Sequence, residues 1–314
     1  MSKQTNSKTI KTSIGGQAVI EGVMMRGPKL TALSVRMPDQ SISTETWDTP
    51  NSNKWYKKTP FIRGVFNFVE SLTDGYKSLM KAAEKAGLDD EEEEPSKFEQ
   101  KLRQLLGDKF MPLLQGCILL FSLAMALFFF AFLPTTLVGF FKDYINHPLA
   151  LSALEGLTKI AILILYLALI SNMSDIKRVF MYHGAEHKTI FCYEHGEELT
   201  VENVRKYTRF HPRCGTSFLV IVLLLSILVS SMVSWDNLWM RVGLKVLCLP
   251  IIMSLSYECI KFAGRHDNLF TRILSAPGLW TQRLTTREPD DSMIEVAIAS
   301  MKKVIPENPD EALF

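Results

Sequence analysis

The sequence is poor in cysteine and has no excess of charge of either sign, and both features limit what the chain can be. Its 314 residues include five cysteines, and Cys117 and Cys248 lie within apolar runs. A disulfide framework is therefore not expected, and a reducing compartment fits better. Lys and Arg number 35 against 33 Asp and Glu, which gives a formal net charge of +2 at pH 7. Binding to nucleic acid is not expected as the main function, because such proteins need a basic surface to meet the phosphates.

Two common sequence signals are also missing. The segment from Met1 to Thr12 is polar and is followed by no apolar stretch, so no secretory signal is predicted. The glycine-dense segment 14–27 lacks the spacing of a nucleotide-binding fingerprint, and its glycines would instead permit close backbone approach or a positive φ. Within it, Glu21 and Arg26 are either site residues from a second region or members of a buried ion pair, and the sequence leaves both open.

Charge is almost absent from four stretches, and these predict transmembrane helices, since about 20 apolar residues cross a hydrocarbon core of roughly 30 Å. The four stretches are residues 110–141, 149–172, 215–235 and, about, 242–262. Pro112 and Pro134 are expected to mark the ends of the first helix. The second stretch carries Glu155 and Lys159, whose i,i+4 spacing with the acid first favours an ion pair.

The distribution of Lys and Arg predicts the orientation of these spans. Basic residues gather in the first 109 residues, in the loop between spans two and three, and in the C-terminal tail. The other two connections carry only Lys142 and Arg241. With four spans, every basic segment falls on one side of the lipid bilayer, which is the cytoplasmic side by the positive-inside rule. The sequence therefore predicts a multi-pass membrane protein with both termini in the cytoplasm.

The predicted fold class is mainly α, with about four transmembrane helices and a small mixed α/β cytoplasmic domain. Its three parts are a cytoplasmic N-terminal domain at 1–109, a four-helix membrane region at 110–264 with a cytoplasmic loop at 173–214, and a cytoplasmic C-terminal tail at 265–314.

Local patterns predict elements within these parts. Residues 33–47 predict two short strands around a Pro-Asp turn. Residues 61–86 predict an amphipathic helix that either lies on the membrane surface or packs against the domain. The acidic run 89–94 predicts a solvated linker. The tail predicts a further amphipathic helix with a capping box formed by Ser292 and Glu295.

The loop between spans two and three contains the residues that predict chemistry. His183 and His187 are four residues apart, so on a helix their imidazoles point the same way and can share one metal ion. Glu186 beside them is a candidate general base for a water molecule at the metal. The order His-x-x-Glu-His is the inverted form of a zinc-protease motif. His211 and Cys214 add a third imidazole and a thiolate just before the third span, and these ligand types suit zinc.

The number of ligands decides the role of such a site. If both motif histidines bind together with His211 and Cys214, the site is closed and structural; if only three bind, an open position remains and Glu186 becomes a catalytic base. Glu258, near the end of span four, is a candidate carboxylate ligand, and pairing with Lys261 or Arg265 is the alternative.

Two further residues and one plainer interpretation remain open. Cys192 and His195 are weaker ligand candidates in the same loop. The histidines can also be polar residues near the lipid headgroups, with Cys214 as a small packing residue.

Five segments of the sequence together resemble one known family. They are GGQAVIEGVMMRG, PFIRGVFNFVESL, HGAEHK, FHPRCGTSF and SAPGLWTQRLTTREPDDSMIEVAI. The chain resembles the YqhQ-like family of bacterial membrane proteins, a domain of unknown function described as predicted metal-dependent enzymes. The resemblance implies a bacterial plasma-membrane location and a bound metal, and it implies no substrate.

These observations lead to two main hypotheses. The first is a zinc-dependent integral membrane hydrolase that acts at the cytoplasmic membrane face on a membrane-protein or lipid-derived substrate. The second is a non-enzymatic membrane scaffold or assembly factor with a structural zinc site. A transporter is a weaker third interpretation, because the spans carry few charges and no paired broken helices.

Overall fold

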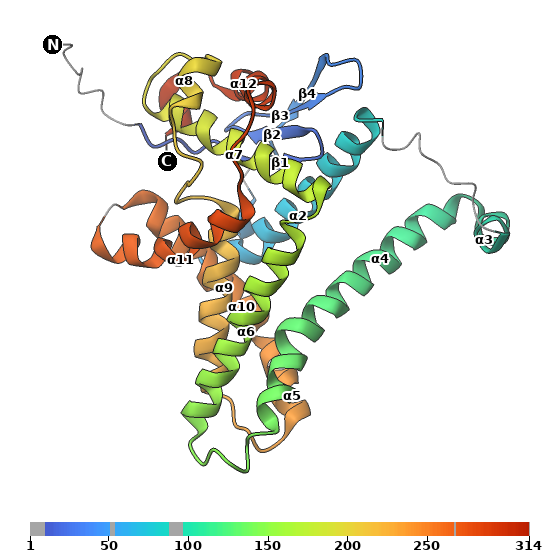
Figure 1. Cartoon of the computed structure of the whole chain (residues 1–314), viewed down its shortest axis with the longest axis vertical. Coiled ribbons are helices and arrows are strands. Elements are labelled where there is room, and N and C mark those ends of the chain that lie inside the picture. The colour runs from blue at the N-terminus through green and yellow to red at the C-terminus, as the bar shows by residue number, and fades with distance from the viewer. Residues whose placement is uncertain (1–9, 51–53, 88–96, 267, 314) are drawn as a thin grey trace. The chain divides into compact units, whose positions relative to one another are not determined.

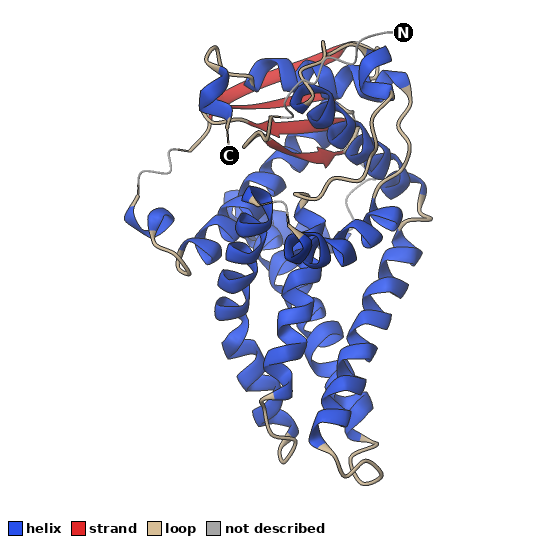
Figure 2. Ribbon diagram, turned by 90° about the vertical axis from the view of Figure 1, so that its left-hand side faces the viewer, coloured by secondary structure: helices blue, strands red, loops and turns tan. Residues whose placement is uncertain are grey.

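The computed structural model describes residues 10–50, 54–87, 97–266 and 268–313. Most described residues are helical, and one small sheet is present (Figure 2). Contacts divide the chain into two units. The first consists of Met1–Leu88, Tyr166–Val222 and Met253–Phe314, and the second of Asp89–Leu165 and Leu223–Ile252. The predicted acidic linker at 89–94 lies outside the described residues.

The first unit contains an antiparallel sheet whose four strands follow the chain order. They are β1 (Gly15–Val19), β2 (Gly22–Arg26), β3 (Leu30–Arg36) and β4 (Ile42–Asp48). The prediction of two strands around a turn is confirmed by β3 and β4, between which Gln40 has a φ of 68°. The β1–β2 hairpin was not predicted, because a segment dense in glycine shows no alternation of apolar and polar side chains.

Each face of this sheet packs against helices, since successive side chains of a strand point to opposite faces. Val23, Met25 and Ala32 pack in one core with α7 (Ser174–Glu194) and α12 (Asp291–Val304). Val19, Leu33 and their neighbours on the other face pack against α2 (Arg63–Lys85). The sheet thus lies between two helical layers (Figure 1), and three distant segments of the chain build one core.

Helix α12 begins earlier than its predicted cap. Asp290 is the N-cap residue, and its Oδ1 accepts a hydrogen bond from the Met293 backbone N–H at 3.0 Å. The predicted capping box of Ser292 and Glu295 is therefore wrong: Ser292 donates to Asp290, and Glu295 pairs with Arg36 at 2.9 Å. The aspartate at the N-cap satisfies an orphan N–H group of the first turn, as Ser292 was expected to do two residues later.

Helix α2 confirms the predicted amphipathic helix, but it turns its apolar stripe outward. Phe66, Val69 and Leu72 are 45%, 54% and 56% exposed, while the small residues Gly64 and Ser78 are buried. Helix α11 (Leu269–Thr285) follows the same rule. Its exposed residues include Leu269, Phe270, Ile273 and Trp280, and its buried ones Thr271, Ser275, Gly278, Thr281, Gln282 and Thr285. Both helices present small and polar side chains to the protein.

Three helices are long and apolar enough to cross a membrane, among the residues that the structure describes. The first runs over Leu113–Gly139, through α4 (Phe110–Leu127), the π-helical turn η3 (Phe128–Phe132) and α5 (Leu133–Gly139). The others are α6 (Pro148–Ile170) and α10 (Leu238–Arg265). A fourth apolar helix, α9 (Gly215–Ser231), has 17 residues.

The first of these helices does not end at Pro134, so that expectation is wrong. The π-helical turn ends at Phe132, two residues before the proline, and Pro134 lies in the first turn of α5, which continues to Gly139. A π-bulge shifts the hydrogen-bond ladder by one residue, so the helix can continue although proline has no N–H group to donate.

The second unit buries a group of charges. The predicted i,i+4 pair is confirmed: Glu155 Oε1 lies 3.0 Å from Lys159 Nζ. The same carboxylate also bonds Lys245 at 2.5 Å and Arg241 at 2.9 Å. The Arg241 guanidinium stacks over the Trp235 ring at 3.8 Å. One carboxylate therefore pairs with three cations, all of them buried.

Glu155→Gln is predicted to destabilise the second unit strongly. It leaves three buried cations without a counter-charge, and breaking such a group typically costs about 3–5 kcal/mol. Thermal unfolding of the purified protein in detergent should show a large fall in melting temperature. Asp143→Asn removes an exposed acid of the same unit and should leave the melting temperature unchanged. Equal melting temperatures for the two variants would contradict this role of Glu155.

Candidate metal centre

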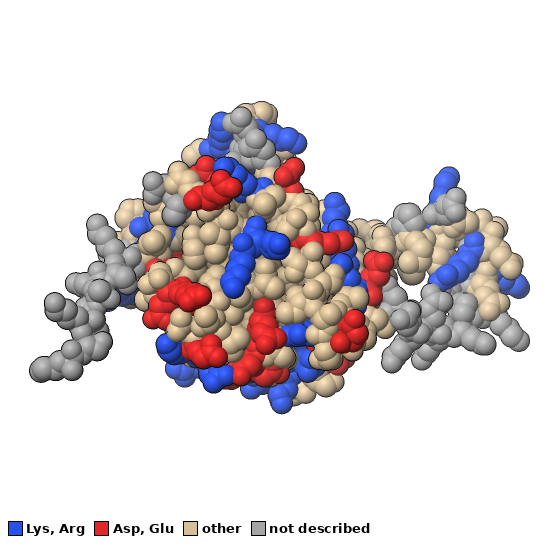
Figure 3. Space-filling view, turned by 90° about the horizontal axis from the view of Figure 1, so that it is seen from above, with Lys and Arg blue, Asp and Glu red and all other residues tan. Residues whose placement is uncertain are grey.

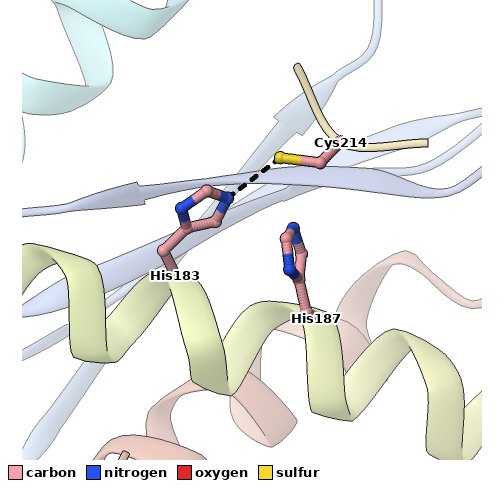
Figure 4. Close-up of side chains that lie close together, drawn as sticks. All are labelled: His183, His187 and Cys214. Atoms are coloured by element: carbon pink, nitrogen blue, oxygen red, sulfur yellow. Dashed lines mark hydrogen bonds between the residues drawn. The ribbon is translucent and has the colours of Figure 1, made fainter. Parts of the chain in front are cut away.

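Helix α7 carries two imidazoles side by side. His183 and His187 project from successive turns toward the same side (Figure 4), and their ring centroids are 4.4 Å apart. Gly184 lies between them at a point of close contact. A Cβ there would lie 2.1 Å from the carbonyl oxygen of Arg287. The glycine that weakens the helix in principle is thus what lets the chain pass close to α7.

Cys214, immediately before α9, completes a group of three. The ligand atoms of His183, His187 and Cys214 all lie within 4.8 Å of one another. His183 Nε2 is 3.1 Å from the Cys214 sulfur (Figure 4). Two imidazole nitrogens and one thiolate converging on one point form a ligand set that suits zinc.

Backbone carbonyls orient both imidazoles. His183 Nδ1 is 2.8 Å from the carbonyl oxygen of Thr285, and His187 Nδ1 is 2.5 Å from that of Arg209. A carbonyl only accepts hydrogen bonds, so each Nδ1 carries the proton and each Nε2 faces the centre. The His187 Nε2 is buried without a hydrogen-bond partner among the described residues. Metal-bound histidines typically show this arrangement.

The three side chains shift one another's protonation. Burial favours the neutral thiol, but the nearby His183 and His187 lower the pKa of Cys214 well below its usual value. Burial likewise opposes charge on His183, yet the Cys214 thiolate raises the pKa of His183 to about 9. The sulfur is therefore held as the thiolate, the form in which cysteine binds metal.

Glu186 lies beside this group and is 4% exposed. The Gly16 backbone N–H donates a hydrogen bond to its carboxylate, while Oε2 has no partner among the described side chains and backbone. Burial raises the pKa of Glu186. Strand β1 can come this close only through a glycine, because a Cβ on Gly16 would lie 2.9 Å from the Glu186 Cδ.

The structure places His211 outside the three-residue group. Its Nε2 lies 3.8 Å from Glu194, and its backbone is held on both sides by the Gln282 amide at 2.7 Å. Burial lowers the pKa of His211 to about 4, so its imidazole is neutral.

Glu258 also lies outside the three-residue group. Its carboxylate accepts hydrogen bonds from Arg63 Nε at 2.7 Å and Nη2 at 2.5 Å. The expected alternative partners were Lys261 and Arg265; Arg63, 195 positions away in sequence, gave no signal of its own.

The weaker ligand candidates also lie outside the group. The Cys192 sulfur is near the backbone oxygens of Glu197 and Glu198, and His195 Nδ1 lies 2.7 Å from the Phe191 carbonyl oxygen.

Glu21 and Arg26 form ion pairs, but not with each other. Glu21 binds Arg178 through two hydrogen bonds of 2.5 Å, and Arg26 binds Glu70 at 2.8 Å. The sequence reasoning missed both partners, and it also missed the carbonyls that orient the histidines. A backbone carbonyl carries no sequence signal, so only the fold can supply it.

A cavity of about 1620 Å³ gives access to the centre. Its wall includes His183, Glu186 and Cys214. The rest of the wall comes from β1, β2 and the loop after it, the end of β4, α2, α7 and the start of α9, with residues such as Gly15, Gln17, Phe68, Leu72, Tyr76 and Leu219.

His187→Ala and Cys214→Ala are predicted to remove the bound metal, whereas His211→Ala and Glu258→Gln should retain it. Only the first two delete atoms of the converging group. Elemental analysis of purified protein would measure this as a fall from about one zinc per chain to a small fraction of that. Loss of zinc from the His211 or Glu258 variant, with the fold intact, would contradict the three-ligand arrangement.

Comparisons with known proteins give a family but no activity. A family model described as "Protein of unknown function (DUF1385)" matches residues 59–307. The chain is 36% identical over 299 residues to the "Uncharacterized protein YqhQ" of Bacillus subtilis (strain 168), covering 94% of this chain and 93% of that protein. No solved structure matches. Since the family model covers well over half of the chain, the protein belongs to the DUF1385 family.

Proposed function

We propose that this protein is a zinc-dependent membrane hydrolase that acts on a membrane-protein or lipid-derived substrate. One observation carries the proposal: three metal-ligating atoms converge beside a buried carboxylate oxygen that has no partner among the described residues. A structural zinc site normally has four protein ligands, whereas a catalytic one has three and keeps a position open. The cavity that reaches this group supplies access for a substrate.

The residues divide into distinct roles. His183, His187 and Cys214 would hold the metal, which, when bound, lowers the pKa of a water molecule and polarises a carbonyl. Glu186 would take the proton from the attacking water and later give it to the leaving group. The carbonyls of Thr285 and Arg209 position the two imidazoles. Burial of Glu186 suits this role, because a raised pKa brings a carboxyl group nearer to working pH.

The same proposal places four helices in the plasma membrane and both termini in the cytoplasm. Helix α9 is an apolar helix of 17 residues, about 25 Å long at 1.5 Å per residue, and the chain after it adds further apolar length up to Trp235. The distribution of Lys and Arg favours four spans, since an odd number would place one basic segment outside. The outward apolar faces of α2 and α11 suit helices lying in the bilayer interface.

Reporter fusions test this topology. Alkaline phosphatase, which is active only outside the cytoplasm, should be active when fused in the loop 142–146 and inactive at the C-terminus. Green fluorescent protein at the C-terminus should fluoresce. An active phosphatase at the C-terminus would mean an odd number of spans and would contradict the proposed orientation.

The second candidate is a scaffold or assembly factor with structural zinc, and in it Glu186 has no catalytic role. In that case zinc would join α7 to the start of α9 and stabilise the fold directly. The absence of His211 from the converging group argues for the open site, since no fourth ligand closes it among the described residues.

Glu186→Gln is predicted to keep the zinc and to lower hydrolysis by about 10²–10⁴-fold, the usual contribution of a general base. Zinc content and turnover should be measured on the same preparation, against quenched-fluorescence peptides and fluorogenic lipid esters. Loss of zinc in this variant would count against the role. Under the scaffold hypothesis the variant is silent in cells, whereas His187→Ala and Cys214→Ala lower protein abundance.

A further inference from the structure

Strand β1 is an edge of the sheet and lies in the wall of the cavity that reaches the metal centre. The strand order is β1-β2-β3-β4, so β1 pairs with β2 on one side only. Gly15, Gly16, Gln17 and Ala18 all line the cavity. An edge strand offers unpaired N–H and C=O groups to any extended chain that comes beside it.

The register of the hairpin shows which backbone groups are free. In an antiparallel pair, alternate residues of a strand direct their backbone groups toward the partner strand. The Gly16 N–H donates to Glu186, so Gly16 points away from β2, and by alternation Ala18 does too. Among the described residues, none forms a hydrogen bond with the outward N–H of Ala18. A donor at Ala18 and acceptors at Gly16 and Ala18 thus face the cavity.

Two helices wall this edge. Helix α7 contributes Val179, Phe180 and His183 to the cavity, and α2 contributes Phe68, Leu72 and Tyr76. Gly15 faces open space, since a Cβ there would meet no atom within 4 Å, whereas a Cβ on Gly16 would lie 2.9 Å from the Glu186 side chain. The metal-ligating His183 and the carboxylate of Glu186 line the same cavity as the edge.

We propose that the cavity binds an extended polypeptide segment, which adds to the sheet as a strand along β1. This deepens the proposed function, on which it rests, by naming a peptide as the substrate. Main-chain hydrogen bonds to Gly16 and Ala18 would hold the segment with an amide beside Glu186. Hydrolysis would then break the amide C–N bond, add the hydroxyl of water to the acyl carbon and pass a proton to the leaving nitrogen.

The hydrogen-bonding chemistry favours a peptide over a lipid chain. A donor and acceptors repeating along β1 match the alternating C=O and N–H groups of an extended peptide. A hydrocarbon chain would leave these backbone groups unpaired, at the cost of desolvating them. Leu72 and Leu219, both in the cavity wall and 56% and 52% exposed, offer apolar contacts suited to side chains of a segment close to a membrane.

Photo-crosslinking tests the proposal on the full chain in detergent. The probe is a mixture of random octapeptides with a central benzoylphenylalanine, applied to the Glu186→Gln variant with and without zinc. Mass spectrometry should locate the crosslinks within 13–18 and on α2 near Leu72 and Tyr76. Ala18→Pro, which removes the outward N–H, should lower the yield about tenfold, while Ala18→Gly, which keeps it, should not.

A second probe keeps the test decisive if Ala18→Pro fails to fold. Octapeptides that are N-methylated at every other residue cannot donate to the strand and should crosslink about tenfold less. Unchanged yields with both the proline variant and the methylated peptides would overturn the proposal. Labelling of the cavity only by a diazirine lysophospholipid would overturn it too.

The same experiment separates this inference from the proposed function. Peptide crosslinks to β1 without any hydrolysis by the unmodified protein would support the peptide-binding site and contradict the proposed hydrolase activity. Glu186-dependent hydrolysis of a lipid ester without peptide crosslinks would support the hydrolase and contradict the peptide-binding site.

Discussion

The burial of a polar turn in α7 is the constraint on which the first unit depends. Glu186, His187, Lys188 and Thr189 are all nearly inaccessible to solvent. Burying such groups is costly unless each finds a hydrogen-bond partner. For two of these residues the partners come from elsewhere in the chain: the Arg209 carbonyl for His187 Nδ1, and Glu288 with the Arg205 carbonyl for Lys188. Satisfying one helix turn therefore fixes the loop before α9 and the segment before α12 around it.

Close backbone contacts at two glycines also hold this unit together. Gly184 allows the chain at Arg287 to touch α7, and Gly16 allows β1 to reach Glu186. Neither contact involves a side chain of the glycine, so no pairing of residue types indicates it. The centre is thus formed by polar groups that need partners and by glycines that let the partners approach.

Elements marked by local sequence patterns were predictable, and contacts between distant segments were not. The apolar runs predicted α4, α6, α9 and α10, because their length suffices to cross a bilayer, and the Pro-Asp turn between two short extended segments predicted β3 and β4. His183 and His187 were predicted as neighbours since helix geometry alone brings them together. Cys214 was grouped with them from its residue type. The ion pairs of Glu258, Glu21 and Arg26 were missed, because charge complementarity does not say which of many cations or anions the fold will bring near.

The assembly of the first unit from three segments bears on how the protein is made. Strands β1 to β4 end at Asp48, yet they bury one face against α12, which begins at Asp291. The carbonyl that orients His183 belongs to Thr285, about a hundred residues after the histidine in the order of translation. The ribosome must therefore synthesise nearly the whole chain before the site can form. A chain that terminates early carries the histidine motif without the carbonyl that orients His183. The site can therefore form only when the polypeptide is nearly complete.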